Sequence, residues 1–147
     1  MEPDLERTLT AAGSLARRLS HSADEVRTLL PVTGTELAYM PERFRTEADA
    51  LFHRVLTLHS LLFRRLLPAV LGDGAAEPAP ADLAGRMVQA GLADDADAVL
   101  ALFALRARLC DSHPEEPQAE AALLNDCARA VPALRALLTR IETVLRG

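Results

Sequence analysis

The chain has 147 residues and a formal net charge of −5, and half of its residues are hydrophobic. This length fits one domain with a proper core, over residues 1–147, and excludes two comfortable ones, while the apolar content excludes a disordered chain. The negative charge argues against an extended nucleic-acid surface, although it leaves room for a local basic groove. The apolar residues are mostly Ala, Leu and Val, and Ala and Leu are strong helix formers.

Lysine is absent, so every basic residue other than histidine is arginine. This excludes a P-loop lysine, a Schiff-base lysine and a Ser-Lys dyad. Cys110 and Cys127 lack metal-ligand spacing and are predicted to be free, buried thiols. The acidic N-terminus has no secretory apolar stretch, and no segment approaches the roughly 20 apolar residues of a membrane span. We therefore expect a cytoplasmic protein without membrane contact.

The first third of the chain is predicted to contain two helices and a connection. Apolar residues at helical spacing favour a helix from about Pro3 to about Ser20. The sequence Ser22-Ala23-Asp24-Glu25 has the form of a capping box, so it predicts a second helix or helical turn, which Pro31 ends. Residues 31–41 are expected to connect this element to the next one with turn chemistry.

The longest predicted helix runs from about Glu42 to Leu71, with apolar residues that keep the 3.6-residue period. Gly72 is expected to end it, and Pro68 is expected to kink its last turn. Residues 72–80, which are rich in Gly, Ala and Pro, predict a flexible loop.

Three further helices are predicted in the second half. A short helix spans about Ala81 to Ala90 and ends at Gly91. Asp94 or Asp95 is positioned to cap the helix that follows.

Residues 111–117 are expected to break that helix, and a last helix, bent by Pro132, spans about Gln118 to Leu145. No strand-like alternation is present. The sequence therefore predicts an all-α bundle of about five to six helices, with one long central helix and up-and-down packing.

The segment from Arg106 to His113 carries the clearest chemical pattern. Arg108 and His113 are separated by four residues at the end of a predicted helix. A guanidinium stabilises the developing charge of a phosphate, and an imidazole moves protons near neutral pH. Together they are a minimal set of groups for cleaving RNA, although this spacing also arises often by chance. The structural alternative is an arginine favoured by the helix dipole and a histidine that caps a loop.

Three blocks of the chain resemble the HepT-like branch of the HEPN superfamily. Residues 49–60 are similar to the long helix of that family, and residues 82–92 are similar to its short helix ending in Leu-x-x-x-Gly and an apolar residue. Residues 105–117 are similar to its Leu-Arg-x-x-Arg-Asn-x-x-x-His-x-Tyr-Pro region. The resemblance covers roughly residues 45–145 and implies a HEPN-type helical bundle.

The resemblance also implies an activity and partners. HepT-like proteins are toxins of toxin–antitoxin systems, and they pair with a minimal nucleotidyltransferase antitoxin of the MntA-like kind. Their motifs meet across a homodimer interface in a composite ribonuclease site that needs no metal or organic cofactor. By that resemblance, Arg108 and His113 are the catalytic pair.

Three more residues are candidates for lining an RNA cleft. Arg54 matches an arginine of the family's long helix; the alternative is a solvated surface arginine. His59, on the same predicted helix, is expected to be a polar residue of the cleft or the dimer interface. Arg106 is a candidate for contacting RNA phosphate or an acidic partner, and a plain surface salt bridge is the alternative.

Several positions depart from the family pattern. Leu109 stands where the family has Asn, Glu115 where it often has Tyr, and His59-Ser60 where it has Gln-Asp. These departures favour a second hypothesis, a catalytically silent HEPN subunit that binds RNA or a substrate for a nucleotidyltransferase partner. A third hypothesis is a helical dimerisation module with no role in RNA chemistry.

Overall fold

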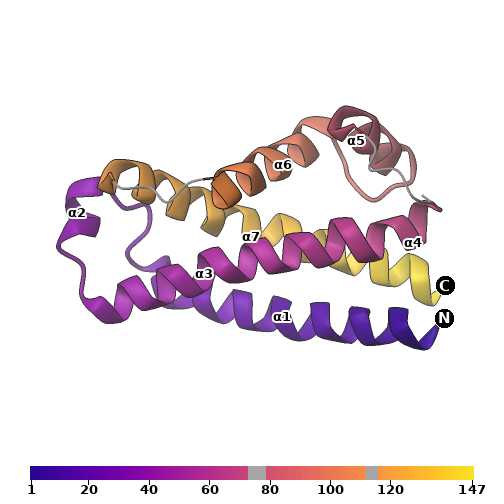
Figure 1. Ribbon diagram of the computed structural model, residues 1–147, viewed down its shortest axis with the longest axis horizontal. Coiled ribbons are helices and arrows are strands. Elements are labelled where there is room, and N and C mark those ends of the chain that lie inside the picture. Colours follow the sequence, from indigo (N-terminus) through magenta and orange to yellow (C-terminus); the bar gives the residue numbers. More distant parts are fainter. Residues whose placement is uncertain (73–78, 112–115) are drawn as a thin grey trace.

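The computed structural model describes residues 1–72, 79–111 and 116–147, and every regular element in these ranges is helical (Figure 1). The elements in chain order are α1 (Pro3–Arg27), α2 (Gly34–Ala38), α3 (Glu42–Leu61), the π-helical segment η1 (Leu62–Leu66), α4 (Leu67–Leu71), α5 (Pro80–Gln89), α6 (Ala96–Asp111) and α7 (Pro117–Arg146). The predicted all-α bundle is confirmed.

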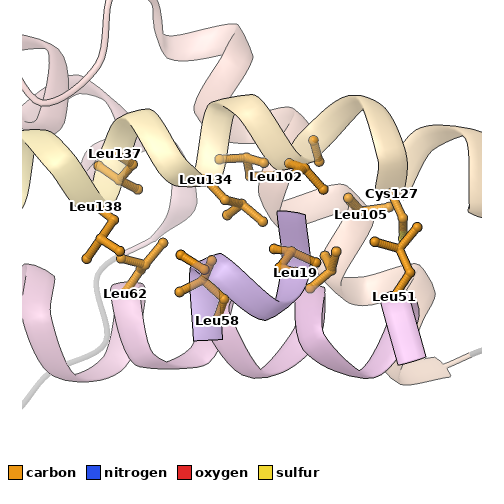
Figure 2. Close-up of a cluster of buried hydrophobic side chains, with 14 of the residues drawn as sticks. Leu19, Leu51, Leu58, Leu62, Leu102, Leu105, Cys127, Leu134, Leu137 and Leu138 are labelled. Carbon is orange, nitrogen blue, oxygen red and sulfur yellow. The ribbon is translucent and has the colours of Figure 1, made fainter. Parts of the chain in front are cut away.

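The core lies where α1, α3, α6 and α7 pack side by side. Each helix contributes an apolar stripe to one continuous cluster, and Figure 2 shows the middle of it. The labelled residues there are Leu19, Leu51, Leu58, Leu62, Leu102, Leu105, Cys127, Leu134, Leu137 and Leu138. Burying a leucine side chain contributes about 1.5–3 kcal/mol, so this cluster holds together segments that are far apart in the sequence.

The two ends of the chain lie beside each other at one end of the bundle (Figure 1). Arg146 donates a hydrogen bond to Glu6 at 2.9 Å, which joins the last turn of α7 to the start of α1. Arg65 contacts Asp4 at 3.0 Å and attaches the π-helical segment to the same turn of α1. Both pairs are solvent-exposed, so they orient the helix ends more than they stabilise them.

The first predicted boundary is wrong, because α1 continues through Ser22 to Arg27. Ser22 is fully buried and does not cap a helix; its hydroxyl accepts a hydrogen bond from Arg54 of α3. A serine in a helix interior is tolerated when its hydroxyl has such a partner. The pattern that resembled a capping box is therefore a contact between two helices.

The connection predicted for residues 31–41 contains a short helix, α2, with its own capping box. Thr33 accepts a hydrogen bond from the Glu36 amide, and the Glu36 carboxylate accepts one from the Thr33 amide. Asn125 of α7 bonds both the amide and the carbonyl of Val32, at 3.0 and 2.9 Å. These bonds satisfy the backbone where the chain crosses from α1 to α3.

The long helix begins at Glu42 and ends at Gly72 (φ 72°), as predicted, but it includes one π-helical turn. In that turn, the amide of Leu67 donates to the carbonyl of Leu62, five residues earlier. Pro68 follows directly and has no N–H for the carbonyl of Arg64. The irregularity predicted at Pro68 is therefore present one turn earlier, as a widened turn.

The second half of the chain confirms most predictions. Gly91 (φ 73°) follows α5, Asp95 accepts a hydrogen bond from the Ala98 amide at the start of α6, and α7 spans Pro117–Arg146 with Pro132 inside it. The bend expected at Pro132 stays a prediction. The loop predicted at residues 72–80 lies largely outside the described residues, since 73–78 are not described.

The prediction for the two thiols is half right. Cys127 is buried, and burial raises the pKa of its thiol to about 12, whereas Cys110 is exposed on α6. Cys127 faces the core from α7 with an exposed fraction of zero, so it acts as a small apolar residue. In the described part of the chain, no helix is long and apolar enough to cross a membrane.

Gly34 permits the closest approach between α2 and α7. A Cβ built at this position would lie 2.6 Å from the backbone nitrogen of Gln118. We predict that Gly34→Ala lowers the free energy of unfolding by about 1–3 kcal/mol, because backbone on both sides must shift. Gly85→Ala is the control, since nothing lies within 4 Å of its Cβ and alanine favours the helix by about 0.5–1 kcal/mol. Urea denaturation of both variants tests this, and equal stabilities would contradict it.

Candidate functional site

Arg108 lies on the last turn of α6, and a carboxylate from α7 holds it. Its Nη1 donates to Oδ2 of Asp126 at 2.6 Å, and 43% of the arginine side chain remains exposed. The other oxygen of Asp126 accepts a hydrogen bond from Arg129, one turn further along α7. One carboxylate thus connects two guanidinium groups, and these three side chains together carry one net positive charge.

The charge of Asp126 is set by opposing effects. Partial burial disfavours the carboxylate, but hydrogen bonds from Arg108 and then Arg129 outweigh burial and lower the pKa of Asp126. Because the folded pKa is below the unfolded value, the pair stabilises the protein at neutral pH. This stabilisation is lost only as the pH falls through the acid range.

His113, the other half of the predicted catalytic pair, lies outside the described residues, as does Glu115. The structure describes α6 up to Asp111 and resumes at Glu116 before α7. The pairing of Arg108 with His113 therefore remains a prediction from the sequence.

Arg54 faces α1. Its guanidinium donates to the hydroxyl of Ser22 and to the carbonyl of Arg18, the latter at 3.3 Å. The side chain is half-buried between the two helices. These contacts explain why the helix carries an arginine here without a carboxylate three or four residues away, and they give it a role in joining α3 to α1.

His59, predicted to line a cleft, is instead buried within the chain, with 3% of its surface exposed. Its ring stacks on Phe63 with centroids 4.2 Å apart, and Phe103 of α6 meets it edge-on at 5.7 Å. Neither ring nitrogen has a hydrogen-bond partner among the described residues. An unpartnered buried polar group costs about 1–3 kcal/mol, and His59 lies three residues before the π-helical segment that begins at Leu62.

The structure brings Arg106 close to His59, although the two are far apart in the sequence. Burial first, and then the positive charges of Arg106 and Arg64, lower the pKa of His59 to about 4. The imidazole is therefore neutral at pH 7. Arg106 and Arg108 are two residues apart and so lie on different faces of α6, and Arg106 does not join the group of Arg108 and Asp126.

Asp126 and Arg129 were not among the residues predicted for the site. Asp126 follows Asn125 on α7, and that pair of adjacent polar residues was the available signal. Arg129, three residues after Asp126, has the spacing of a helical ion pair. Among the described residues, no group of three His, Cys, Asp or Glu side chains is placed to hold a metal ion.

Comparison with known proteins gives no match: no protein-family model, no curated protein and no solved structure matches this chain.

The buried histidine predicts a pH-dependent stability. Its folded pKa of about 4 lies below the unfolded value of 6.5, so the unfolded chain binds more protons between these values. We predict that lowering the pH from 6.5 to 4 removes roughly 3 kcal/mol of stability through this group. His59→Leu should flatten that dependence and leave the protein at least as stable at pH 7.

Urea denaturation from pH 7 to pH 4 measures the effect. His53→Leu, which removes an exposed histidine of the same helix, is the control and should retain the wild-type slope. An unchanged slope in His59→Leu would contradict the assignment.

Proposed function

We propose that this chain is a metal-independent ribonuclease of the HepT-like kind, in which Arg108 and His113 are the catalytic residues. The observation that carries the proposal is the placement of Arg108. It lies on the exposed last turn of α6, oriented by Asp126, and five residues before His113. The order of helices also supports it: a long helix, a short helix ended by glycine, a helix that carries the arginine, and a long final helix.

The chemistry proposed is attack of a ribose 2′-oxygen on the adjacent phosphorus. The bond from phosphorus to the 5′-oxygen breaks, which leaves a 2′,3′-cyclic phosphate and a 5′-hydroxyl. His113 takes the proton of the 2′-hydroxyl as a base or gives one to the leaving 5′-oxygen as an acid, and water takes the other of these two roles. Arg108 stabilises the additional negative charge of the phosphorane-like transition state. These steps balance without a cofactor.

We further propose a homodimer and a nucleotidyltransferase partner. In a two-fold dimer the same surface of each chain meets its copy, so two motifs at the end of α6 would form one composite site. A minimal nucleotidyltransferase of the MntA-like kind would serve as the antitoxin. Arg54, Arg106 and His59 are candidates for positioning the elements that form the RNA cleft, and in this structure each of them faces another helix.

A second candidate function is a catalytically silent binding subunit, and the pairing of Arg108 favours it. The guanidinium already bonds the carboxylate of Asp126 at 2.6 Å, so a phosphate has to compete with that carboxylate. The replacement of the family's Asn by Leu109 removes a neighbouring polar group. In this function the protein would present RNA or another substrate to the nucleotidyltransferase.

Cleavage of a mixed RNA substrate in the presence of EDTA tests the proposed activity. The wild-type protein should produce 2′,3′-cyclic phosphate ends, and His113→Ala should cleave about 10²–10⁴-fold more slowly, since a general acid–base contributes this much. His21→Ala, at an exposed histidine of α1, is the matched control. Absence of cleavage by the wild type would support the binding subunit, which should still copurify with its partner after His113→Ala.

Arg108→Ala separates catalysis from stability. We expect cleavage to fall about 10²–10³-fold, while the melting temperature changes by less than about 4 °C, because exposed ion pairs contribute little. Arg140→Ala breaks a comparable pair with Asp94, at 2.9 Å, and should keep full activity. A large fall in melting temperature for Arg108→Ala would instead indicate a structural role for the pair with Asp126.

A further inference from the structure

A groove of about 920 Å³ runs between the C-terminal part of α1, the connection after it, and the middle of α7. Its floor is apolar and includes Leu30, Pro31, Val131 and Pro132. This volume is in the range of sites that bind small molecules or segments of a polymer. It lies on the side of the bundle formed by α1 and α7, which pack against each other in the core.

The rim of the groove is positively charged, in contrast with the acidic chain. Arg27, Arg129 and Arg135 line it, and Asp24 is the one carboxylate among its lining residues. Arg27 pairs with Asp24 at 2.5 Å and Arg129 pairs with Asp126, whereas no ion pair between described residues involves Arg135. Grooves with one sign of charge concentrate ligands of the opposite sign, so the charge favours an anionic ligand.

The apolar lining includes a proline in the middle of α7. Pro132 and Ala128, one helical turn earlier, both line the groove, and the pyrrolidine ring takes the position where a helical N–H would lie. At one end of the groove, the side-chain amide of Asn125 bonds the backbone of Val32 and holds that end in place. A rigid apolar surface of this kind is suited to the flat face of a base.

The groove adjoins the proposed reaction centre. Asp126 accepts hydrogen bonds from Arg108 and from Arg129, and Arg129 lines the groove. The carboxylate of Asp126 therefore lies between Arg108, where a phosphate would bind, and Arg129, the first arginine of the groove. Arg129 and Arg135 are six residues apart, which is about 9 Å along the helix axis. This distance corresponds to between two and three nucleotides of a stacked strand, at about 3.4 Å for each nucleotide.

We infer that this groove binds a single-stranded segment of the RNA that the proposed active site cleaves. The inference rests on the proposed function for the identity of the ligand. Arg27, Arg129 and Arg135 bind the phosphates, and the apolar lining around Pro132 receives the face of a base. Planar guanidinium groups bind phosphate oxygens in pairs and also stack on bases, which is the combination that a single strand requires.

Fluorescence anisotropy of a labelled single-stranded RNA of ten nucleotides, titrated with the full chain in EDTA, tests the inference. The RNA carries 2′-O-methyl groups, so it cannot be cleaved and binding is measured alone. Arg135→Ala and Arg27→Ala should each weaken binding about 5- to 10-fold. Each should also reduce the slope of log K against log salt by about 0.7, the value for one lost phosphate contact on a single strand.

Arg7→Ala is the matched control. Arg7 also lies on α1, is as exposed as Arg27 and pairs with an aspartate three residues earlier, but it is at the far end of the helix. It should bind RNA as the wild type does. Equal loss of RNA affinity in Arg7→Ala and Arg27→Ala would overturn the inference, because it would indicate non-specific attraction between the RNA and any surface arginine.

Two further outcomes decide the ligand. Absence of RNA binding by the wild type, or displacement of the RNA by polyglutamate at equal charge concentration, would overturn the inference and indicate an acidic protein partner. Binding that depends on Arg27 and Arg135, together with no cleavage of unmodified RNA, would support the groove and contradict the proposed ribonuclease. Failure of the activity is thereby distinguished from failure of the groove.

Discussion

The structure depends on the burial of one apolar stripe of α7 against α1, α3 and α6. Residues from Leu124 to Ile141 on this stripe are almost without exposed surface. This packing fixes the rotation of a 30-residue helix about its axis. The exposed part of the helix then carries Asp126 toward α6 and Arg135 toward the end of α1, with Arg129 between them. The positions of these charged side chains are therefore a consequence of the packing of the apolar stripe.

The aromatic group around His59 is the costly part of this core. The ring centroids of Phe63 and Phe103 lie 4.9 Å apart, and both rings pack against the imidazole of His59. The imidazole nitrogens have no hydrogen-bond partner among the described residues. A leucine would fill such a position without that cost. The widened turn from Leu62 to Leu66 follows directly and places Arg64 near the ring. The joint between α3 and α6 is thus less optimised for stability than the rest of the bundle.

Asp126 limits what Arg108 can do. The carboxylate holds the guanidinium in one orientation, which favours catalysis because a positioned group reacts without further ordering. It also competes with a phosphate for the same donors. Arg129 shares the carboxylate and so weakens that competition, since the group of two guanidiniums and one carboxylate retains a positive charge. Whether Arg108 acts on RNA depends on this balance more than on the motif itself.

Local patterns in the sequence were sufficient for the helices, their order and most of their ends. Gly72 and Gly91 mark boundaries that depend on nearby backbone geometry alone, and the sequence determined them. The sequence narrowed the cap of α6 to Asp94 or Asp95, and the structure has Asp95. The continuation of α1 past Ser22 was not predictable, because the partner of that hydroxyl is Arg54, 32 residues away. The burial of His59 likewise depends on Phe103 of another helix.

For the candidate site, the sequence supplied the residue types and the spacing of Arg108 and His113. It could not supply Asp126 as the partner of Arg108, because the two residues lie on different helices, 18 positions apart. Nor could it supply the basic groove, whose arginines come from α1 and α7 at opposite ends of the chain. Helical periodicity and caps are local properties, whereas ion pairs between helices and grooves exist only once packing has fixed which faces meet.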